Sequence, residues 1–156
     1  MRVLVLSDSH GCVDNMDRCV RLAEPDHILH LGDCVRDAEH LARLWPAIPM
    51  TTVPGNCDWG DGDQAEKLIE LGARRILMMH GHTRGVKYSL QRAVYAAREC
   101  GAEVLVFGHT HAPLVDYDGS LYVMNPGTIG GVGAPATYGV ITIGAGRLEC
   151  STFRLP

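Results

Sequence analysis

Side chains of the types that bind metal ions occur in five short clusters spread over the first two thirds of the chain. The clusters are Asp8-Ser9-His10, Gly32-Asp33, Gly55-Asn56-Cys57-Asp58, His80-Gly81-His82 and Gly108-His109-Thr110-His111. Carboxylates and imidazoles are common protein ligands of divalent metals. Metal binding is therefore the first hypothesis, provided that the fold brings the clusters together.

The spacing inside the clusters favours this hypothesis. Asp8 and His10 are two residues apart, as are His109 and His111, so in extended or turning backbone each pair can face one centre. Glycines beside the candidates permit left-handed or closely packed backbone, namely Gly11, Gly32, Gly55, Gly81 and Gly108. Each cluster alone also has an ordinary explanation, because Asp often caps helices and Gly-Asp is a common turn pair. Their joint occurrence favours metal binding.

The elements that must position these clusters follow an α/β pattern. Strands are predicted over residues 2–6, 27–31, 50–53, 66–71, 74–79 and 104–107, with the fourth and fifth forming a hairpin. The apolar positions Met16, Cys19, Val20 and Ala23 predict a helix capped by Asp14. Further helices are predicted over 38–45 and 89–100, with Gly101 just after the last one. The remaining third is predicted to form antiparallel strands.

All five clusters directly follow predicted strands. In α/β proteins the carboxyl ends of parallel strands lie together at one edge of the sheet. Groups that are far apart in sequence can therefore converge there, as a metal site requires.

The ordered clusters resemble the motifs of the calcineurin-like metallophosphoesterase superfamily, in particular its small phosphodiesterase branch in bacteria and archaea. The segment Asn125-Pro126-Gly127-Thr128 is similar to one that follows the last ligands in that branch. The resemblance implies an α/β fold, a four-layer α/β/β/α sandwich of two mixed sheets flanked by helices. It also implies that residues 1–156 form a single metallophosphoesterase domain.

The resemblance further implies two divalent metal ions. One would be held by Asp8, His10, Asp33 and His111, and the other by Asp33, Asn56, His80 and His109, with Asp33 bridging the two. Mixed oxygen and nitrogen ligands suit Mn²⁺, Fe²⁺, Ni²⁺ or Zn²⁺ better than Mg²⁺ or Ca²⁺. By analogy with the family, Mn²⁺ is the expected activating ion.

The activity that the resemblance implies is hydrolysis of a small phosphodiester by a hydroxide that bridges the two ions. Asp33, Asn56 and His82 are the expected catalytic residues, and Asn56, Cys57 and His82 the expected substrate contacts. Many superfamily members have His where this chain has Cys57, so His82 is the better candidate for the general acid. Good leaving groups, such as those of aryl phosphodiesters, are then favoured. Trp59 is expected to flank the cleft.

Two alternatives to a phosphodiesterase remain open. One is a non-catalytic, partner-binding scaffold like the retromer subunit of the same fold, although the complete set of seven ligands argues against it. The other is a phosphomonoesterase or nucleotide pyrophosphatase, which would use the same metals in a differently shaped cleft.

Composition excludes several other classes of protein. The chain has 156 residues, 46% of them apolar, and no apolar run near the roughly 20 residues of a membrane span. A net charge of −4 without a Lys/Arg block argues against a nucleic-acid partner. No signal peptide is recognisable, so we expect a cytoplasmic protein whose six cysteines are free thiols. The expected partner is a small phosphoester, and homo-oligomerisation is left open.

Overall fold

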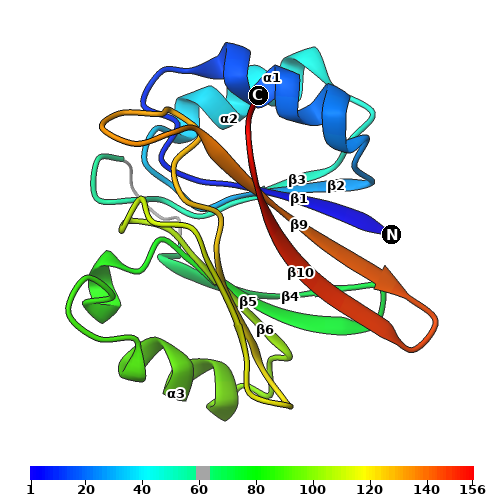
Figure 1. The fold of residues 1–156 in the computed structure, drawn as a ribbon, viewed down its shortest axis with the longest axis vertical. Coiled ribbons are helices and arrows are strands. Elements are labelled where there is room, and N and C mark those ends of the chain that lie inside the picture. Colours follow the sequence, from blue (N-terminus) through cyan, green and yellow to red (C-terminus); the bar gives the residue numbers. More distant parts are fainter. Residues whose placement is uncertain (59–63) are drawn as a thin grey trace.

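Two five-stranded sheets pack face to face, and helices cover their outer faces (Figure 1). This computed structural model describes residues 1–58 and 64–156. The strand order is β10-β9-β1-β2-β3 in the first sheet and β4-β5-β6-β8-β7 in the second. The predicted four-layer α/β/β/α sandwich of mixed sheets is confirmed.

The first sheet has three parallel strands, which carry the first three clusters. They are β1 (Arg2–Leu6), β2 (His27–His30) and β3 (Met50–Thr52). The antiparallel strands β9 (Thr137–Gly144) and β10 (Arg147–Arg154) extend the sheet beyond β1. The helices α1 (Val13–Ala23) and α2 (Val35–Leu44) cover its outer face (Figure 1).

The second sheet carries the two remaining clusters. It consists of β4 (Glu66–Leu71), β5 (Arg74–Met79), β6 (Val104–Phe107), β7 (Leu114–Tyr117) and β8 (Tyr122–Asn125). The helix α3 (Gln91–Glu99) packs on its outer face, and the short 3₁₀ helix η1 (His82–Arg84) follows β5. The predicted hairpin is confirmed as β4 and β5, which pair antiparallel.

The expectation of purely antiparallel strands in the last third is wrong for β8. Although β7 and β8 pair antiparallel, β8 pairs parallel with β6. The chain passes to the edge as β7 and returns as β8 between β7 and β6. In this order β8 is mostly buried, whereas all four residues of the edge strand β7 are exposed.

The alternation of side chains along β1 explains how the layers hold together. Val3 and Val5 point into the core between the two sheets, whereas Leu4 and Leu6 point into the core beneath α1 and α2. Successive side chains of a strand face opposite sides, so a strand with helices on one face and a second sheet on the other is apolar throughout.

The helix boundaries differ from the predicted ones. The first helix has Cys12 at its N-cap and Asp14 in its first turn, so the prediction that Asp14 caps it is wrong. The second begins at Val35, three residues earlier than predicted, and the third is shorter at both ends. Gly101 does follow the third helix in left-handed backbone, with φ +65°.

Two compositional expectations can also be compared with the structure. All six cysteines are free, as predicted. Among the described residues, no helix has the length and apolar character needed to cross a membrane.

Candidate metal centre

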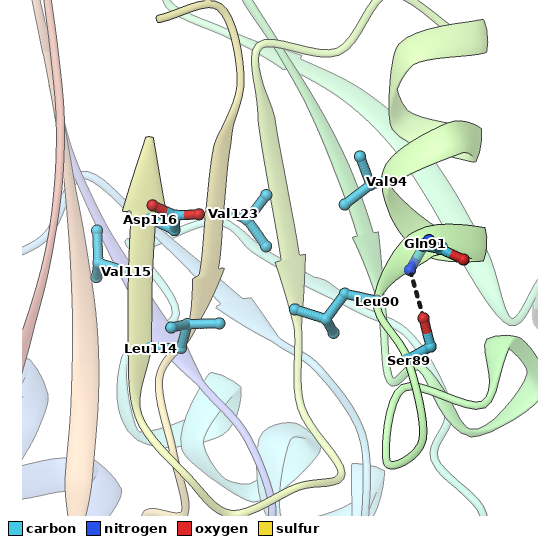
Figure 2. A pocket seen from close by; sticks show the side chains of 8 residues that line it. All are labelled: Ser89, Leu90, Gln91, Val94, Leu114, Val115, Asp116 and Val123. Atoms are coloured by element: carbon cyan, nitrogen blue, oxygen red, sulfur yellow. Dashed lines mark hydrogen bonds between the residues drawn. The ribbon is translucent and has the colours of Figure 1, made fainter. Parts of the chain in front are cut away.

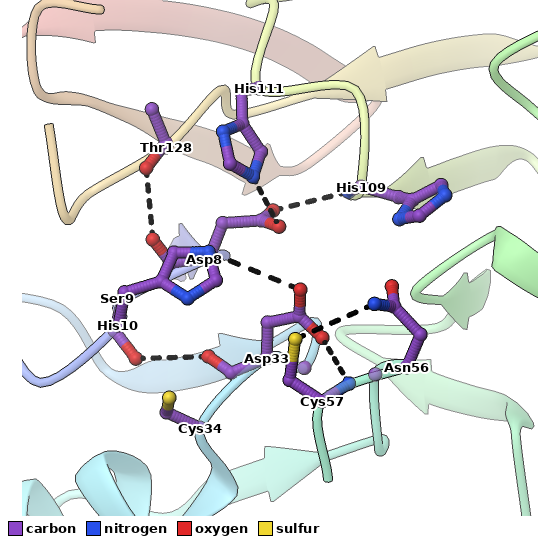
Figure 3. Close-up of polar contacts among 12 residues, drawn as sticks. Asp8, Ser9, His10, Asp33, Cys34, Asn56, Cys57, His109, His111 and Thr128 are labelled. Atoms are coloured by element: carbon purple, nitrogen blue, oxygen red, sulfur yellow. Dashed lines mark hydrogen bonds and ion pairs between the residues drawn. The ribbon is translucent and has the colours of Figure 1, made fainter. Parts of the chain in front are cut away.

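The five clusters meet where the carboxyl ends of β1, β2 and β3 face those of β5 and β6. Hydrogen bonds connect the two sheets directly at this place. The N–H of His109 donates to Asp8 Oδ2 at 3.1 Å, and His80 Nδ1 lies 2.8 Å from the carbonyl oxygen of Leu31. Figure 3 shows side chains from both sheets converging on one space.

Asp8 has one oxygen that is well bonded and one that is not. Oδ2 accepts the Ser7 hydroxyl at 2.5 Å as well as the His109 N–H. Oδ1 is buried and receives no hydrogen bond, although His111 Nε2 lies 3.0 Å away (Figure 3). A buried carboxylate oxygen without a donor is costly. A cation between this oxygen and the imidazole would satisfy both.

His80 presents a lone pair to a group of oxygen atoms. The carbonyl at Nδ1 can only accept, so Nδ1 carries a proton, and in the neutral form of the ring Nε2 has a lone pair. Nε2 lies 3.0 Å from Asn56 Oδ1 and 3.5 Å from Asp33 Oδ1, both of which also only accept. His109 Nδ1 is 3.1 Å away. These nitrogen and oxygen atoms together could serve as ligands of a divalent cation.

Asp33 lies between the two sets of imidazoles. Its Oδ1 accepts the N–H of Cys57 at 2.9 Å, and its Oδ2 lies 4.0 Å from His10 Nε2 (Figure 3). Burial alone would raise the pKa of Asp33, but the N–H of Cys57 and the other groups around the carboxylate outweigh burial and lower the pKa. The side chain is therefore an anion at neutral pH.

The structure thus brings all seven predicted metal ligands to one place. Asp8, His10 and His111 offer ligand atoms within 4.8 Å of one another, and so do Asp8, Asp33 and His80. Asp8 belongs to both groups. Asn56 and His109 join the second group through their contacts with His80.

Five of the seven predicted ligands adopt left-handed backbone. They are Asp8 (φ +54°), His10 (+45°), Asp33 (+56°), His109 (+66°) and His111 (+59°). Such backbone costs a non-glycine residue roughly 1–3 kcal/mol and clusters at functional sites. The sequence predicted that neighbouring glycines would make these turns, but the ligands also take the strained conformations themselves.

His82 and Cys57 border the centre. The His82 ring lies 5.4 Å from that of His80, and its Nδ1 is buried without a hydrogen-bond partner. Burial lowers the pKa of His82. Burial and the Asp33 carboxylate raise the pKa of the exposed Cys57 thiol, so without metal this thiol stays protonated at neutral pH. Trp59 lies outside the described residues.

Burial also keeps His109 neutral. It lowers the pKa of this histidine to about 4, and the nearby positive charge of Lys87 acts in the same direction. The imidazole is therefore available as a ligand at neutral pH, since metals bind the unprotonated ring.

Several supporting residues were not predicted. The Thr128 hydroxyl donates to the carbonyl oxygen of Asp8 at 2.9 Å, and Asn125 Nδ2 donates to that of Gly108 at 2.9 Å. Both belong to the Asn125–Thr128 segment, whose resemblance to the family was the available signal. Nothing in the sequence indicated that Ser7 supports the centre, because a Ser beside an Asp is common.

A separate hollow of about 490 Å³ lies between the start of α3 and the strands β7 and β8 (Figure 2). Apolar side chains such as Leu90, Val94, Leu114 and Val115 line it, together with the carboxylate of Asp116. It contains none of the predicted site residues and only one metal-ligating group. The chemistry of the five clusters therefore belongs to the other location.

Comparison with known proteins gives consistent results. A family model described as the calcineurin-like phosphoesterase superfamily domain matches residues 1–146. The probable metallophosphoesterase YsnB of Bacillus subtilis (strain 168) is 37% identical over 132 residues, covering 83% of this chain and 75% of that protein. Phosphodiesterase YfcE of Escherichia coli (strain K12) is 26% identical over 170 residues, covering 90% and 87%.

Solved structures show the same fold. A predicted phosphoesterase from Streptococcus pneumoniae TIGR4 has a TM-score of 0.78 at 26% identity, covering 98% of this chain and 88% of that one. Vps29 from Entamoeba histolytica complexed with Zn²⁺ has a TM-score of 0.74 at 21% identity and covers both chains completely. The second likeness concerns the fold alone.

Proposed function

The chain belongs to the calcineurin-like phosphoesterase superfamily, and from this premise we propose that it is a dinuclear metal-dependent phosphodiesterase that hydrolyses a small phosphodiester. The observation that carries the proposal is the buried Asp8 Oδ1, which has no hydrogen-bond donor and faces His111 Nε2 at 3.0 Å. Together with the lone pair of His80, it marks a cluster of ligands that a cation would complete.

In this proposal Asp8, His10, Asp33 and His111 hold one ion, and Asp33, Asn56, His80 and His109 hold the other, with Mn²⁺ as the activating metal. When bound, two such ions supply positive charge that lowers the pKa of water and neutralises phosphoryl oxygens. The chain fits this role because Asp33 is anionic and His109 is neutral at neutral pH.

We assign contact with the substrate to Asn56, Cys57 and His82, and protonation of the leaving group to His82. The lowered pKa leaves His82 mostly neutral near pH 7, and the N–H of a neutral imidazole can only hydrogen-bond to the leaving oxygen, so the proton itself would come from the minor imidazolium form. Its position is firm, because Arg84 in the same 3₁₀ helix forms a two-bond ion pair with Glu66 of β4. Cys57 is the weaker candidate, because nearby cations would favour its thiolate, which cannot donate a proton. The nucleophile in this proposal is water.

The name of the Escherichia coli relative supports a phosphodiesterase, and the likeness to Vps29 supports the scaffold alternative only at the level of the fold. The decisive experiment measures hydrolysis by chelator-treated protein with Mn²⁺, Ni²⁺, Fe²⁺ or Zn²⁺ added. An aryl phosphodiester is compared with the corresponding monoester. We expect Mn²⁺-dependent turnover of the diester and none in Asp33→Ala. Preference for the monoester would favour a phosphomonoesterase, and no turnover with any ion would favour the scaffold.

The identity of the acid can be tested at Cys57. A Cys57→His substitution adds an imidazole where many relatives have one, so hydrolysis of diesters with poor, alkyl leaving groups should gain more than that of aryl diesters. The measurement is the dependence of kcat on the pKa of the leaving group. An unchanged dependence would count against this account of substrate preference.

A further inference from the structure

Two carboxylates that are not among the proposed ligands bond to the loops that carry ligands. Asp37 lies in the first turn of α2, and Asp58 is the last residue of the third cluster. The N-terminal part of α2 carries Asp37, and the N–H groups at its start bond to Asp58, so the helix is a common support for the loops of the first sheet.

Asp58 joins the loop after β2 to the loop after β3. Its Oδ1 accepts the N–H groups of Cys34 and Val35 at 2.9 and 2.8 Å, and its Oδ2 accepts the N–H of Gly55 at 2.8 Å. The side chain of Cys34, at the N-cap of α2, makes no capping bond. Asp58 therefore caps this helix from another loop, with its negative charge at the favourable end.

Asp37 holds the loop after β1. Its Oδ2 accepts the Ser9 hydroxyl and the N–H of Gly11, both at 2.7 Å. These two residues flank His10. Ser9 Oγ also lies 3.2 Å from Nε2 of the fully buried His30, which places the hydroxyl between the imidazole and the carboxylate.

The loop after β2 has strained backbone. Asp33 and Cys34 are consecutive residues with φ +56° and +78°, a conformation that persists only when the surroundings fix it. The hydrogen bonds from the amides of Cys34 and Val35 to Asp58 supply this restraint immediately after the strained pair.

We propose that Asp37 and Asp58 are positioning residues, which act through the N-terminus of α2 to hold the three ligand loops of the first sheet in place for metal binding. The inference rests on the proposed function. Asp37 supports the loop of Asp8 and His10, whereas Asp58 supports the loops of Asp33 and Asn56. Within the described residues, the loops of the second sheet bond to neither carboxylate.

The test is a calorimetric titration of chelator-treated protein with Mn²⁺. We expect Asp37→Asn and Asp58→Asn to weaken Mn²⁺ binding by about 10- to 100-fold, as loss of outer-shell partners typically does. Saturating Mn²⁺ should restore most of the kcat for an aryl phosphodiester. Glu39→Gln is the matched control, because Glu39 is an exposed carboxylate on the same helix, and it should bind Mn²⁺ like the parent.

Urea unfolding without metal shows whether each variant is folded, and a purely stabilising role would change this unfolding but not the Mn²⁺ affinity of folded protein. If an Asn variant does not fold, milder substitutions test the same interaction. Ser9→Ala removes the hydroxyl at Asp37 and should weaken binding about tenfold. Asp58→Glu keeps the charge but misplaces it, so its affinity should lie between those of parent and Asn variant.

The outcomes separate the two proposals. A parent protein that binds no Mn²⁺ contradicts the proposed function itself. A parent that binds Mn²⁺, together with folded variants that bind it equally well, overturns the positioning role and leaves the proposed function intact.

Discussion

At the scale of single residues, the candidate centre concentrates acceptor atoms that do not satisfy one another. Asp8 Oδ1 has no donor, and the lone pair of His80 faces the oxygens of Asn56 and Asp33. Such an arrangement is unfavourable for folding without metal and favourable for binding a cation. We therefore expect substitutions here to have opposite effects on metal-free stability and on metal binding.

Asp8→Asn tests most directly whether metal-free stability and metal binding change in opposite directions. The amide oxygen can accept the bonds from Ser7 and His109, while the NH₂ group donates to His111, so the metal-free variant should be more stable than the parent by about 1 kcal/mol. It should also lose hydrolysis and stabilisation by Mn²⁺. Urea unfolding with chelator or Mn²⁺ measures both effects. The exposed Asp14→Asn serves as control, and a less stable metal-free Asp8→Asn protein would contradict the prediction.

The buried His30 predicts how stability depends on pH. Burial lowers its pKa from 6.5 to about 4, so the unfolded chain binds a proton that the folded protein does not. Stability is then complete above pH 6.5 and declines as the pH falls toward 4. Between pH 7.5 and pH 5 this one group should remove about 2 kcal/mol.

The measurement is urea unfolding in chelator at both pH values. His30→Gln should lose about 2 kcal/mol less than the parent on acidification. It still keeps the part that comes from His109, whose pKa is also lowered to about 4. The exposed His40→Gln should behave like the parent. Equal losses in the parent and His30→Gln would show that His30 is protonated to the same extent in both states.

At the scale of elements, the ends of strands position the proposed ligands by bringing backbone segments very close together. A Cβ on Gly108, just after β6, would lie 2.0 Å from Ser7 Oγ and 2.9 Å from Asp8 Oδ2, which follow β1 in the other sheet. A Cβ on Gly55, after β3, would lie 2.2 Å from Asp33 Oδ1. These glycines matter for their lack of a side chain, which allows the loops to touch.

Gly108→Ala should therefore separate the two sheets at the centre. We expect a loss of about 1–3 kcal/mol in the free energy of unfolding from overpacking, accompanied by weaker Mn²⁺ binding. Gly144→Ala is the control, because its nearest neighbour, Arg147 Cβ, would be 3.8 Å away. Thermal unfolding and calorimetry measure the two effects. A Gly108→Ala protein that binds Mn²⁺ like the parent would show that the contact is not needed.

At the scale of the whole molecule, the proposed ligands come from both sheets. Asp8, His10, Asp33 and Asn56 follow strands of the first sheet, while His80, His109 and His111 follow strands of the second. Metal bound at this junction would connect the two halves of the sandwich, so its binding energy would contribute to global stability.

Addition of Mn²⁺ should consequently raise the free energy of unfolding, by about 2.7 kcal/mol when the free ion is at 100 times its dissociation constant. Differential scanning calorimetry with Mn²⁺ or chelator provides the measurement. Asp33→Ala should show little of this increase. A parent whose unfolding temperature does not respond to Mn²⁺ would argue against a centre shared by the two sheets.

Local patterns in the sequence were sufficient to predict much of this protein. Short-range periodicity and turn residues predicted the strand Arg2–Leu6, the hairpin of β4 and β5, and the helix α3. The order of the polar clusters after strands indicated the candidate ligands. These features depend on neighbours within a few residues, which is the range that a sequence pattern covers.

Only the tertiary structure decided the remaining features, because they depend on atoms that are remote along the chain. Three of these features have no local signal in the sequence. They are the parallel pairing of β8 with β6, the hydrogen bond from His109 to Asp8 across 101 residues, and the cap that Asp58 places on α2. The same holds for the unpaired Asp8 Oδ1, since whether a buried oxygen finds a donor depends on every segment packed around it.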